Sequence, residues 1–303
     1  MSRAVSDTPV SGVHPLRVAG GLIRAARPRQ WVKNVLVFAA PFTAARISEL
    51  PVLTSAVIAF VAFCLASSAI YLVNDAKDVE ADRAHPTKCR RPIAAGIVPV
   101  PAAYATAVVL VLAALAVSMA HNWSLTIVIA VYVVVQLAYC YGLKHQPVID
   151  LCIVASGFLL RSIAGGVSAH IPLSQWFLLA TAFGSLYMVA GKRYSEIHLF
   201  ERTGAEIRAS LRRYSSSYLR FVWATSVAVL IMTYGLWAFE LHQKSGSTWS
   251  LISMVPFVIA LFRYAVDVDS GRAGAPEDIV LRDRVLQVLG ACWVLTMVLA
   301  FYA

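Results

Sequence analysis

Long, almost uninterrupted apolar runs are the feature that most restricts how this chain can fold. Each run is close to the roughly 20 residues that a helix needs to cross a hydrocarbon core about 30 Å thick. The runs lack the alternation of apolar and polar residues that marks the strands of an outer-membrane barrel. Charged residues make up only 14% of the 303 positions, whereas a soluble domain carries roughly 25%. We therefore predict an all-α polytopic membrane protein, because a helix satisfies its own backbone groups inside lipid.

About nine segments qualify as transmembrane helices, and Pro, Gly or charged clusters separate them. The first is shorter than the others. The candidate spans cover residues 33–46, 52–75, 100–120, 123–142, 148–168, 173–190, 217–239, 249–266 and 284–302. Residues 1–28 are polar and basic and lack the apolar core of a secretory signal, so we expect a cytoplasmic N-terminal tail. Residues 29–303 are expected to form a single transmembrane domain.

The basic residues are distributed very unevenly between the two sides of these spans. Of the 26 Lys and Arg residues, all except Arg46, Lys244 and Arg161 fall in the N-terminal tail or in loops on one side. Because positive charge favours the cytoplasmic side, the N-terminus and the basic loops are predicted to be cytoplasmic. These cations lie on short loops beside the membrane, so we expect the lipid bilayer, and no nucleic acid, as a macromolecular partner.

The end of the second candidate span carries a set of oxygen ligands. On a helix that advances about 100° per residue, Asn74, Asp75, Asp78 and Asp82 fall within about one quarter of the circumference. Carboxylates gathered on one face repel each other unless a cation joins them, and oxygen-only ligands suit Mg²⁺. The alternative is an ordinary solvated helix end, but such ends seldom leave three acids on one stripe at a membrane boundary. The pattern predicts a Mg²⁺ site.

A basic loop follows this acidic stripe. Residues 85–96 contain two prolines and a glycine, which favour a rigid connection. Lys88, Arg90 and Arg91 within this loop can cover the phosphates of a metal-bound anion. Acids that bind a metal, next to cations that bind phosphate, together favour a metal-bound anion that carries phosphate.

These motifs resemble those of the UbiA superfamily of intramembrane prenyltransferases. The resemblance rests on N-D-x-x-D-x-x-x-D at residues 74–82, on the R-P-I-A-A-G that ends the basic loop, on R-P-x-Q-W-x-K-N at residues 27–34, and on Tyr141-Gly-Leu-Lys144. It extends over nearly the whole chain. It implies a helical bundle around a central cavity, with Mg²⁺ and a diphosphate at the cytoplasmic mouth. It also favours a homo-oligomer such as a trimer.

The chain departs from that family after the sixth span. Ordinary members carry a second Asp-rich motif there, whereas this chain has Lys192, Arg193 and Glu196 on one helix face. Positive charge in place of a second metal site suits a substrate with more phosphate than a prenyl diphosphate has. Phosphoribosyl pyrophosphate fits, because it carries a diphosphate and a separate 5-phosphate. The whole set is similar to the polyprenyl-phosphate phosphoribosyltransferases, a branch of the superfamily.

That resemblance implies a Mg²⁺-dependent transferase. It would move 5-phosphoribosyl from phosphoribosyl pyrophosphate to a polyprenyl phosphate, on the cytoplasmic face of the inner (plasma) membrane, in the synthesis of arabinan donors for a mycobacterial-type cell wall. The residues expected to act in catalysis are Asp75, Asp78 and Lys192, and those expected to bind the metal are Asn74, Asp75, Asp78 and Asp82. The residues expected to bind substrate are Gln30, Lys33, Asn74, Tyr71, Arg83, Lys88, Arg91, Tyr141, Lys144, Arg161, Arg193, Tyr194 and Glu196.

Arg161 falls inside a candidate span, where a charged side chain costs at least about 2.5–3.5 kcal/mol. Such a residue either belongs to a functional site or forms a structural ion pair, and Asp150 is a candidate partner.

Two other functions remain open from the sequence. One is a prenyltransferase that moves a prenyl group from prenyl diphosphate to an aromatic acceptor, although the missing second acidic motif argues against it. The other is a transporter or lipid-binding membrane protein that performs no chemistry. Internal repeats with broken spans, which are common in transporters, are not evident in the sequence.

Overall fold

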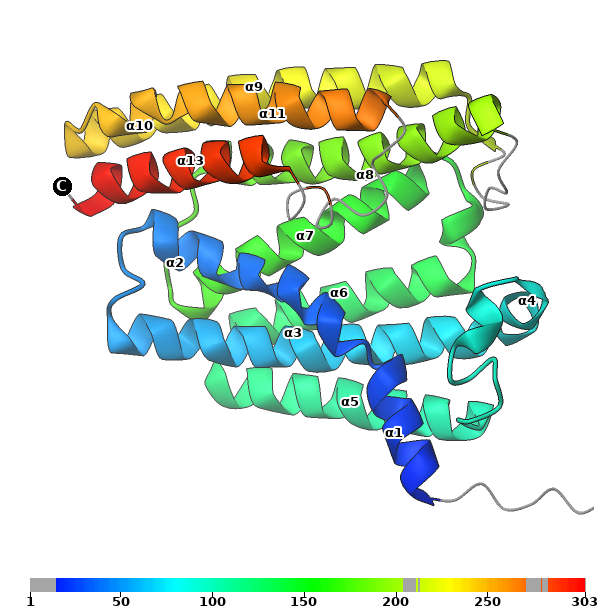
Figure 1. The fold of residues 1–303 in the computed structure, drawn as a ribbon. Coiled ribbons are helices and arrows are strands. Elements are labelled where there is room, and N and C mark those ends of the chain that lie inside the picture. Colours follow the sequence, from blue (N-terminus) through cyan, green and yellow to red (C-terminus); the bar gives the residue numbers. More distant parts are fainter. Residues whose placement is uncertain (1–14, 204–210, 212, 271–278, 280–282, 303) are drawn as a thin grey trace, which may run out of the picture.

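The computed structural model describes residues 15–203, 211, 213–270, 279 and 283–302, and every regular element within these ranges is helical (Figure 1). The N-terminal part contains α1 (Pro15–Ala25), the 3₁₀ helix η1 (Pro28–Phe38), α2 (Ala39–Thr43), α3 (Leu50–Lys77), α4 (Val79–Ala84) and the short 3₁₀ helix η2 (Lys88–Arg90). The middle contains α5 (Val100–His121), α6 (Trp123–Tyr141), the short 3₁₀ helix η3 (Leu143–His145) and α7 (Ile149–Ser168). The C-terminal part contains α8 (Gln175–Thr203), α9 (Ser216–Ser245), α10 (Trp249–Ile252), α11 (Met254–Asp269) and α13 (Arg284–Tyr302).

The prediction of an all-α polytopic membrane protein is confirmed. Within the described ranges, seven helical segments are long and apolar enough to cross a membrane, with α10 and α11 counted as one. Helix α8 is as long as these, but it is not among the seven and carries Lys192, Arg193 and Glu196 in its second half. The predicted number of nine spans is therefore approximate.

The first candidate span, 33–46, is wrong as a single helix. The segment consists of η1 and the five-residue α2 in sequence, and a left-handed residue, Ala45 (φ 57°), follows. Pro28 and Pro41 lack the backbone N–H that a long α-helix would use. The segment also packs directly on the backbone of α7, where a Cβ added to Gly165 would lie 1.8 Å from the carbonyl oxygen of Val37. Gly165 thus permits a contact that the hydropathy pattern does not reveal.

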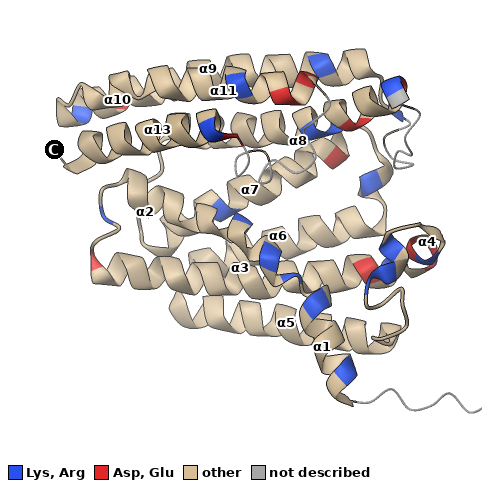
Figure 2. Cartoon of the chain, viewed as in Figure 1, with Lys and Arg blue, Asp and Glu red and all other residues tan. Residues whose placement is uncertain are grey.

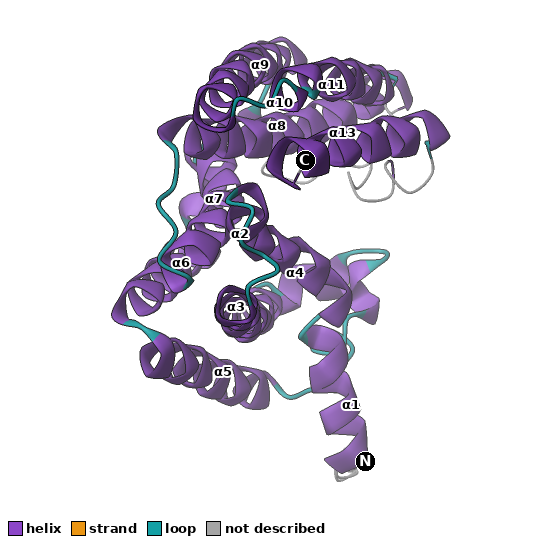
Figure 3. Ribbon diagram, turned by 90° about the vertical axis from the view of Figure 1, so that its left-hand side faces the viewer, coloured by secondary structure: helices purple, strands orange, loops and turns teal. Residues whose placement is uncertain are grey.

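The helices form two groups that pack side by side. Seen along the helix axes in Figure 3, α3 lies inside the first group, where it contacts α5, α6, α7 and η1. Alanines such as Ala59, Ala62 and Ala66 are fully buried along α3, and small residues of this kind let helix backbones approach closely. In the second group, α8 contacts α7, α9 and α11, and α11 contacts α13. Aromatic residues fill its core, including a stack of Tyr187 and Tyr194 on Trp223.

One end of the bundle gathers most of the charged residues (Figure 2). The C-terminal ends of α3, α6, α8 and α11 lie there, together with the N-terminal ends of α5, α7, α9 and α13 (Figure 1). This end is the one that the charge distribution predicts to be cytoplasmic. Arg46, between α2 and α3, and Lys244, in the last turn of α9, lie at the opposite end, where each pairs with a glutamate close to it in sequence.

Candidate active site

The acidic stripe lies where α3 passes into α4. Helix α3 ends at Lys77, and Asp78 has φ −94° and ψ 12° before α4 begins at Val79. The backbone N–H of Asp78 still donates to the Asn74 carbonyl at 3.0 Å, and that of Asp82 donates to the Asp78 carbonyl at 2.8 Å. The single helix expected through residues 74–82 is therefore interrupted at Asp78. The helical spacing that gathers the acids nevertheless carries through it.

Arg91 of the basic loop joins two of the acids. One nitrogen of its guanidinium donates to Asp75 at 3.0 Å and to Asp82 at 2.6 Å. Both carboxylates are buried, with 2% and 4% of their side-chain surfaces exposed. A second guanidinium, from Arg27, also donates to Asp75 at 2.6 Å. The basic loop therefore folds over the acidic stripe, as the sequence suggests.

Arg27 is a residue that the candidate site did not include. It stands in the left-handed region at φ 54°, immediately before η1, and its guanidinium lies 4.9 Å from the centre of the Tyr71 ring. A signal was present in the Arg-Pro that opens the motif at residues 27–34, because a proline restricts the backbone of the residue before it.

The third acid, Asp78, pairs with a different cation. Lys144, on η3 after α6, donates to Asp78 at 2.5 Å. The thiol of Cys140 lies 3.8 Å from the side-chain oxygen of Asn74. Lys77 also lies 5.4 Å from the centre of the Tyr141 ring. These contacts hold the C-terminal ends of α3 and α6 together at the charged end of the bundle.

The oxygen ligands of this cluster suit Mg²⁺, but each carboxylate is already paired with a cationic side chain. Within the described part of the chain, no three Asp, Glu, His or Cys side chains are gathered so as to hold a metal ion. Asp75 and Asp82 nonetheless already share one cationic nitrogen, so a cation lies between their oxygens. The donors of this motif are all oxygens, which Mg²⁺ prefers. A metal bound here would neutralise the carboxylates in place of Arg27, Arg91 and Lys144.

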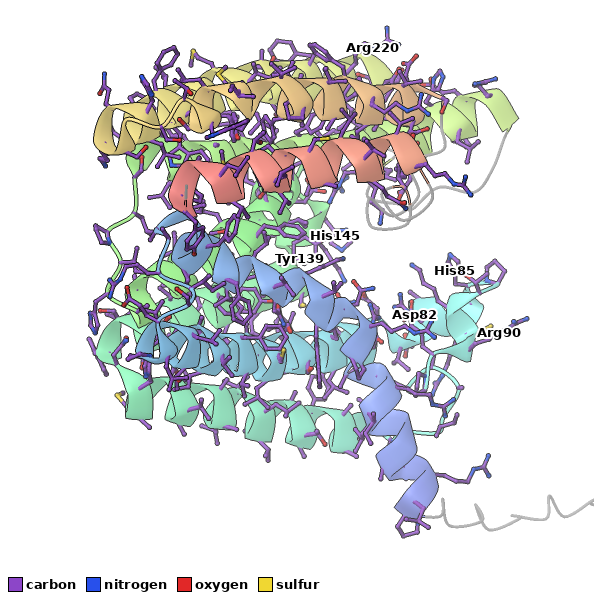
Figure 4. All side chains as sticks on the ribbon, turned by 60° about the vertical axis from the view of Figure 1, so that its left-hand side comes forward. Asp82, His85, Arg90, Tyr139, His145 and Arg220 are labelled. Carbon is purple, nitrogen blue, oxygen red and sulfur yellow. The ribbon has the colours of Figure 1, made fainter. Side chains whose placement is uncertain are left out.

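The other predicted substrate ligands of this region differ in their exposure to solvent. Arg83 is exposed and donates to the Ala94 carbonyl at 3.2 Å, and Tyr141 is exposed over 59% of its surface. Lys88, Gln30, Lys33 and Tyr71 are partly buried. Figure 4 shows Asp82, His85 and Arg90 on the segment that follows α3, with Arg220 in the other group of helices. The acids and cations of the segment after α3 therefore lie close to one another and far from Arg220 of α9.

Arg193 on α8 forms a buried ion pair with Asp150 at the start of α7. The hydroxyl of Tyr214 donates to the same carboxylate and accepts from the backbone N–H of Val148 at 2.6 Å. Burial raises the pKa of the Tyr214 hydroxyl, which keeps it a donor. These contacts fasten the 142–150 loop, and with it Lys144, to α8 and to the residues before α9. Asp150 and Tyr214 were not among the candidate site residues.

Arg161 does not pair with Asp150, so that prediction was wrong. Its guanidinium donates to the side-chain oxygen of Asn34 at 2.7 Å, to the Gly157 carbonyl at 2.5 Å and to the Tyr132 hydroxyl at 3.4 Å. It also lies over the ring of Phe63, at 5.3 Å. Among the described residues, no carboxylate forms an ion pair with Arg161. Neutral oxygens and aromatic faces stabilise this cation, which ties η1 to α7.

Two further candidates on α8 have different surroundings. The Tyr194 hydroxyl accepts from Arg220 at 2.6 Å and donates to Asp269 at 3.1 Å, so it links α8 with α9 and α11. Lys192 is partly buried, and within the described ranges its ammonium has no hydrogen bond or ion pair. Glu196, one turn further along α8, is also partly buried. Lys192 is thus a cation that is available for an incoming anion.

We expect Arg193→Met to destabilise the protein by about 3–5 kcal/mol, because Asp150 would remain buried without its counter-charge. Thermal unfolding of the detergent-solubilised protein measures this loss. The double variant Arg193→Met with Asp150→Asn should recover much of it. Arg46→Met, which breaks an exposed pair with Glu49, is the matched control and should change little. Equal melting temperatures for Arg193→Met and wild type would contradict the role of this pair in holding α7 on α8.

The fold and the charged end together define a class: a multi-pass helical membrane protein with an acidic, arginine-covered cluster at one end of its helices. The UbiA prenyltransferase family model matches residues 35–282, and the chain belongs to that family.

The chain is similar over nearly its whole length to several bacterial enzymes. It is 58% identical over 287 residues to the decaprenyl-phosphate phosphoribosyltransferase of Mycobacterium tuberculosis H37Rv, covering 93% of this chain and 95% of that one. It is 56% identical over 300 residues to the protein of the same name from Mycolicibacterium smegmatis, covering 95% and 94%. The corresponding protein from Corynebacterium glutamicum is 55% identical over 294 residues, with 95% and 89% covered.

Solved structures share the fold at low sequence identity. A UbiA homolog from Archaeoglobus fulgidus, solved with GPP and Mg²⁺, superimposes with a TM-score of 0.69 at 17% identity, covering 93% of this chain and 98% of that one. A digeranylgeranylglyceryl phosphate synthase structure gives 0.63 at 14% identity, covering 93% and 96%. The resemblance to the UbiA superfamily that the motifs indicate is therefore confirmed.

Proposed function

We propose that this protein transfers 5-phosphoribosyl from phosphoribosyl pyrophosphate to decaprenyl phosphate and releases pyrophosphate. The observation that carries the proposal is the identity of 55–58% to proteins named decaprenyl-phosphate phosphoribosyltransferase, over nearly the full length of both chains. The cations of α8, which occupy the place of the family's second acidic motif, also support it. A donor with a separate 5-phosphate needs such cations more than it needs another metal site.

The proposed site opens on the cytoplasmic face of the plasma membrane. Basic loops mark the cytoplasmic side of membrane proteins, and the acidic stripe lies at the same end of the bundle as those loops (Figure 2). A water-soluble, strongly anionic donor would reach this end from the cytoplasm. The acceptor phosphate would reach it from the bilayer, where its chain is held.

In this proposal Asn74, Asp75, Asp78 and Asp82 would hold Mg²⁺. Their oxygen-only chemistry supports the assignment, as does the Mg²⁺ in the structure of the A. fulgidus homolog. A bound Mg²⁺ supplies positive charge to the pyrophosphate as it leaves. Residues 29–303 would then act as one catalytic domain. The trimer stays a prediction.

The chain's own cations position the two phosphate-bearing substrates. Arg91 and Lys144, which now neutralise the acids, would donate to the diphosphate instead. Lys192 would bind the 5-phosphate from α8. An oxygen of the lipid phosphate attacks C1 of the ribose while the bond from C1 to the pyrophosphate oxygen breaks, with inversion at C1. The nucleophile is already an anion, so the reaction needs no strong general base.

The decisive experiment supplies purified protein with ribose-labelled phosphoribosyl pyrophosphate, decaprenyl phosphate and Mg²⁺. The expected result is label in the lipid fraction together with an equal amount of free pyrophosphate, and chelation of the metal with EDTA should abolish both. A parallel reaction contains prenyl diphosphate and an aromatic acid. If no lipid-linked ribose forms, the proposal is wrong. A prenylated aromatic product would point to the other transferase reaction, and binding without a product would point to a transporter or lipid-binding protein.

A further inference from the structure

An apolar groove of about 290 Å³ runs along the outside of α3, α5 and α6. Its floor comes from α3 and consists of Ala69, Ile70 and Val73, which are nearly fully buried. Ala107 of α5, also buried, adds a second small side chain beside Ala69. Small side chains at these positions leave room that larger ones would fill.

The walls of the groove open outward. Val108 and Leu112 of α5 line one wall and are exposed over 58% and 61% of their surfaces. Leu137 and Tyr141 of α6 line the other. Because these helices are among the apolar membrane-crossing segments, the exposed walls face lipid. The groove therefore opens sideways into the bilayer.

The cytoplasmic end of the groove lies next to the candidate active site. Tyr141 closes this end, and the ammonium of Lys77 lies 5.4 Å from the centre of its ring. Lys144, three residues after Tyr141, holds Asp78 of the acidic stripe. Lys77 itself is exposed and has no ion pair within the described residues. An apolar groove that ends beside an unpaired lysine is complementary to a lipid with a phosphate at one end.

We propose that this groove binds the first isoprene units of the acceptor polyprenyl phosphate and presents its phosphate to Lys77, next to the donor diphosphate that Lys144 would contact. The inference rests on the proposed function, because it names the place of that reaction's acceptor. From Tyr104 to Leu112 the α5 wall is about 12 Å long, at 1.5 Å per residue. That length accommodates the start of the chain and leaves the remainder in the bilayer.

A second apolar groove, between α7 and α8, fits such a ligand less well. It is smaller, at about 190 Å³, and is lined by residues that include Cys152, Phe183 and Leu186. The nearby cation, Arg193, is already neutralised by Asp150, which Tyr214 also contacts. A lipid phosphate at that end would have to break a buried ion pair. The groove along α3 has an unpaired lysine instead.

The groove should bind the acceptor through close packing and charge rather than through the hydrophobic effect. Lipid tails are as apolar as the groove, so moving an isoprenoid chain from the bilayer into it releases little free energy. Packing along the walls and the contact of phosphate with lysine must supply the selectivity. Filling the groove should therefore raise the KM for the acceptor and leave the KM for the soluble donor unchanged.

The test fills the groove from its lipid-facing wall. Val108→Trp should raise the KM for decaprenyl phosphate by about tenfold, which corresponds to about 1.4 kcal/mol, with the KM for phosphoribosyl pyrophosphate unaltered. Val109→Trp is the matched control, because Val109 is exposed over 64% of its surface on the same helix but does not line the groove. A second control, Ala182→Trp, fills the α7–α8 groove instead.

A photoreactive polyprenyl phosphate, with a diazirine in its first isoprene units, provides an independent measurement. Crosslinks should map to α5 and α6 around Val108 and Leu137. Crosslinks at Phe183 and Leu186, or equal acceptor KM values for Val108→Trp and Val109→Trp in active protein, would overturn the groove assignment. Competition of the crosslink by an ordinary phospholipid at equal concentration would overturn it as well. An inactive wild type would instead contradict the proposed function, so the two failures are distinguishable.

Discussion

Replacing Asp75 with asparagine should lower kcat for phosphoribosyl transfer by about 10²–10³-fold, the usual cost of removing one group that stabilises transition-state charge. Asp75 is the most enclosed acid of the stripe, and both Arg27 and Arg91 donate to it. The amide keeps the shape of the side chain but removes one negative charge. The metal would lose an anionic ligand, and two guanidinium groups would lose their shared counter-charge. Initial rates at a series of Mg²⁺ concentrations measure the effect.

The control for this variant is Glu80→Gln. Glu80 is exposed on α4, and the same carboxylate-to-amide change there should leave kcat unaltered. Size-exclusion profiles in detergent establish that both variants are folded. If Asp75→Asn retained full activity at all Mg²⁺ concentrations, the acidic stripe would not be the site of the reaction.

Lys192→Gln should raise the KM for phosphoribosyl pyrophosphate by about 10–100-fold, because a hydrogen bond to a charged group contributes roughly 1.5–3 kcal/mol. The ammonium of Lys192 has no partner within the described residues, so its removal leaves no buried acid behind. The effect should therefore appear in donor binding rather than in stability. Steady-state kinetics with the donor varied at saturating acceptor measure it.

A donor analogue without the 5-phosphate shows whether that phosphate is the partner of Lys192. Wild type and Lys192→Gln should use ribose 1-diphosphate with similar KM values, because this donor lacks the 5-phosphate that Lys192 would bind. Arg202→Gln is the control, because Arg202 is exposed near the end of the same helix. An unchanged donor KM in Lys192→Gln would remove Lys192 from the site.

Hydropathy predicts most of the fold because membrane-crossing helices depend on a property of the local sequence. Helix α5 (Val100–His121) and helix α13 (Arg284–Tyr302) match their candidate spans within a residue or two. The first span fails because hydropathy does not register the prolines of residues 28–43 or their tertiary contact, the approach of Val37 to Gly165. No pattern within that segment encodes the neighbouring helix.

The site is predicted in part for a similar reason. The acids of the stripe and the basic loop are close in sequence, so the contact between Arg91 and Asp82 follows from local spacing. Arg193 was expected to bind phosphate, and its pairing with Asp150 depends on how α7 and α8 are rotated against each other. The partners of Arg161 come from three other helices. The sequence identifies such charged residues but does not identify their partners.

The cluster at the end of α3 is electrically balanced before any substrate arrives. Three acids, Asp75, Asp78 and Asp82, are matched by three basic side chains, those of Arg27, Arg91 and Lys144. A divalent ion alone would leave this enclosed region with excess positive charge, and a polyanionic donor alone would leave excess negative charge. Both imbalances are costly where solvent is limited. In the proposed reaction, metal and donor are therefore most favourably taken up as a pair, and each strengthens the binding of the other.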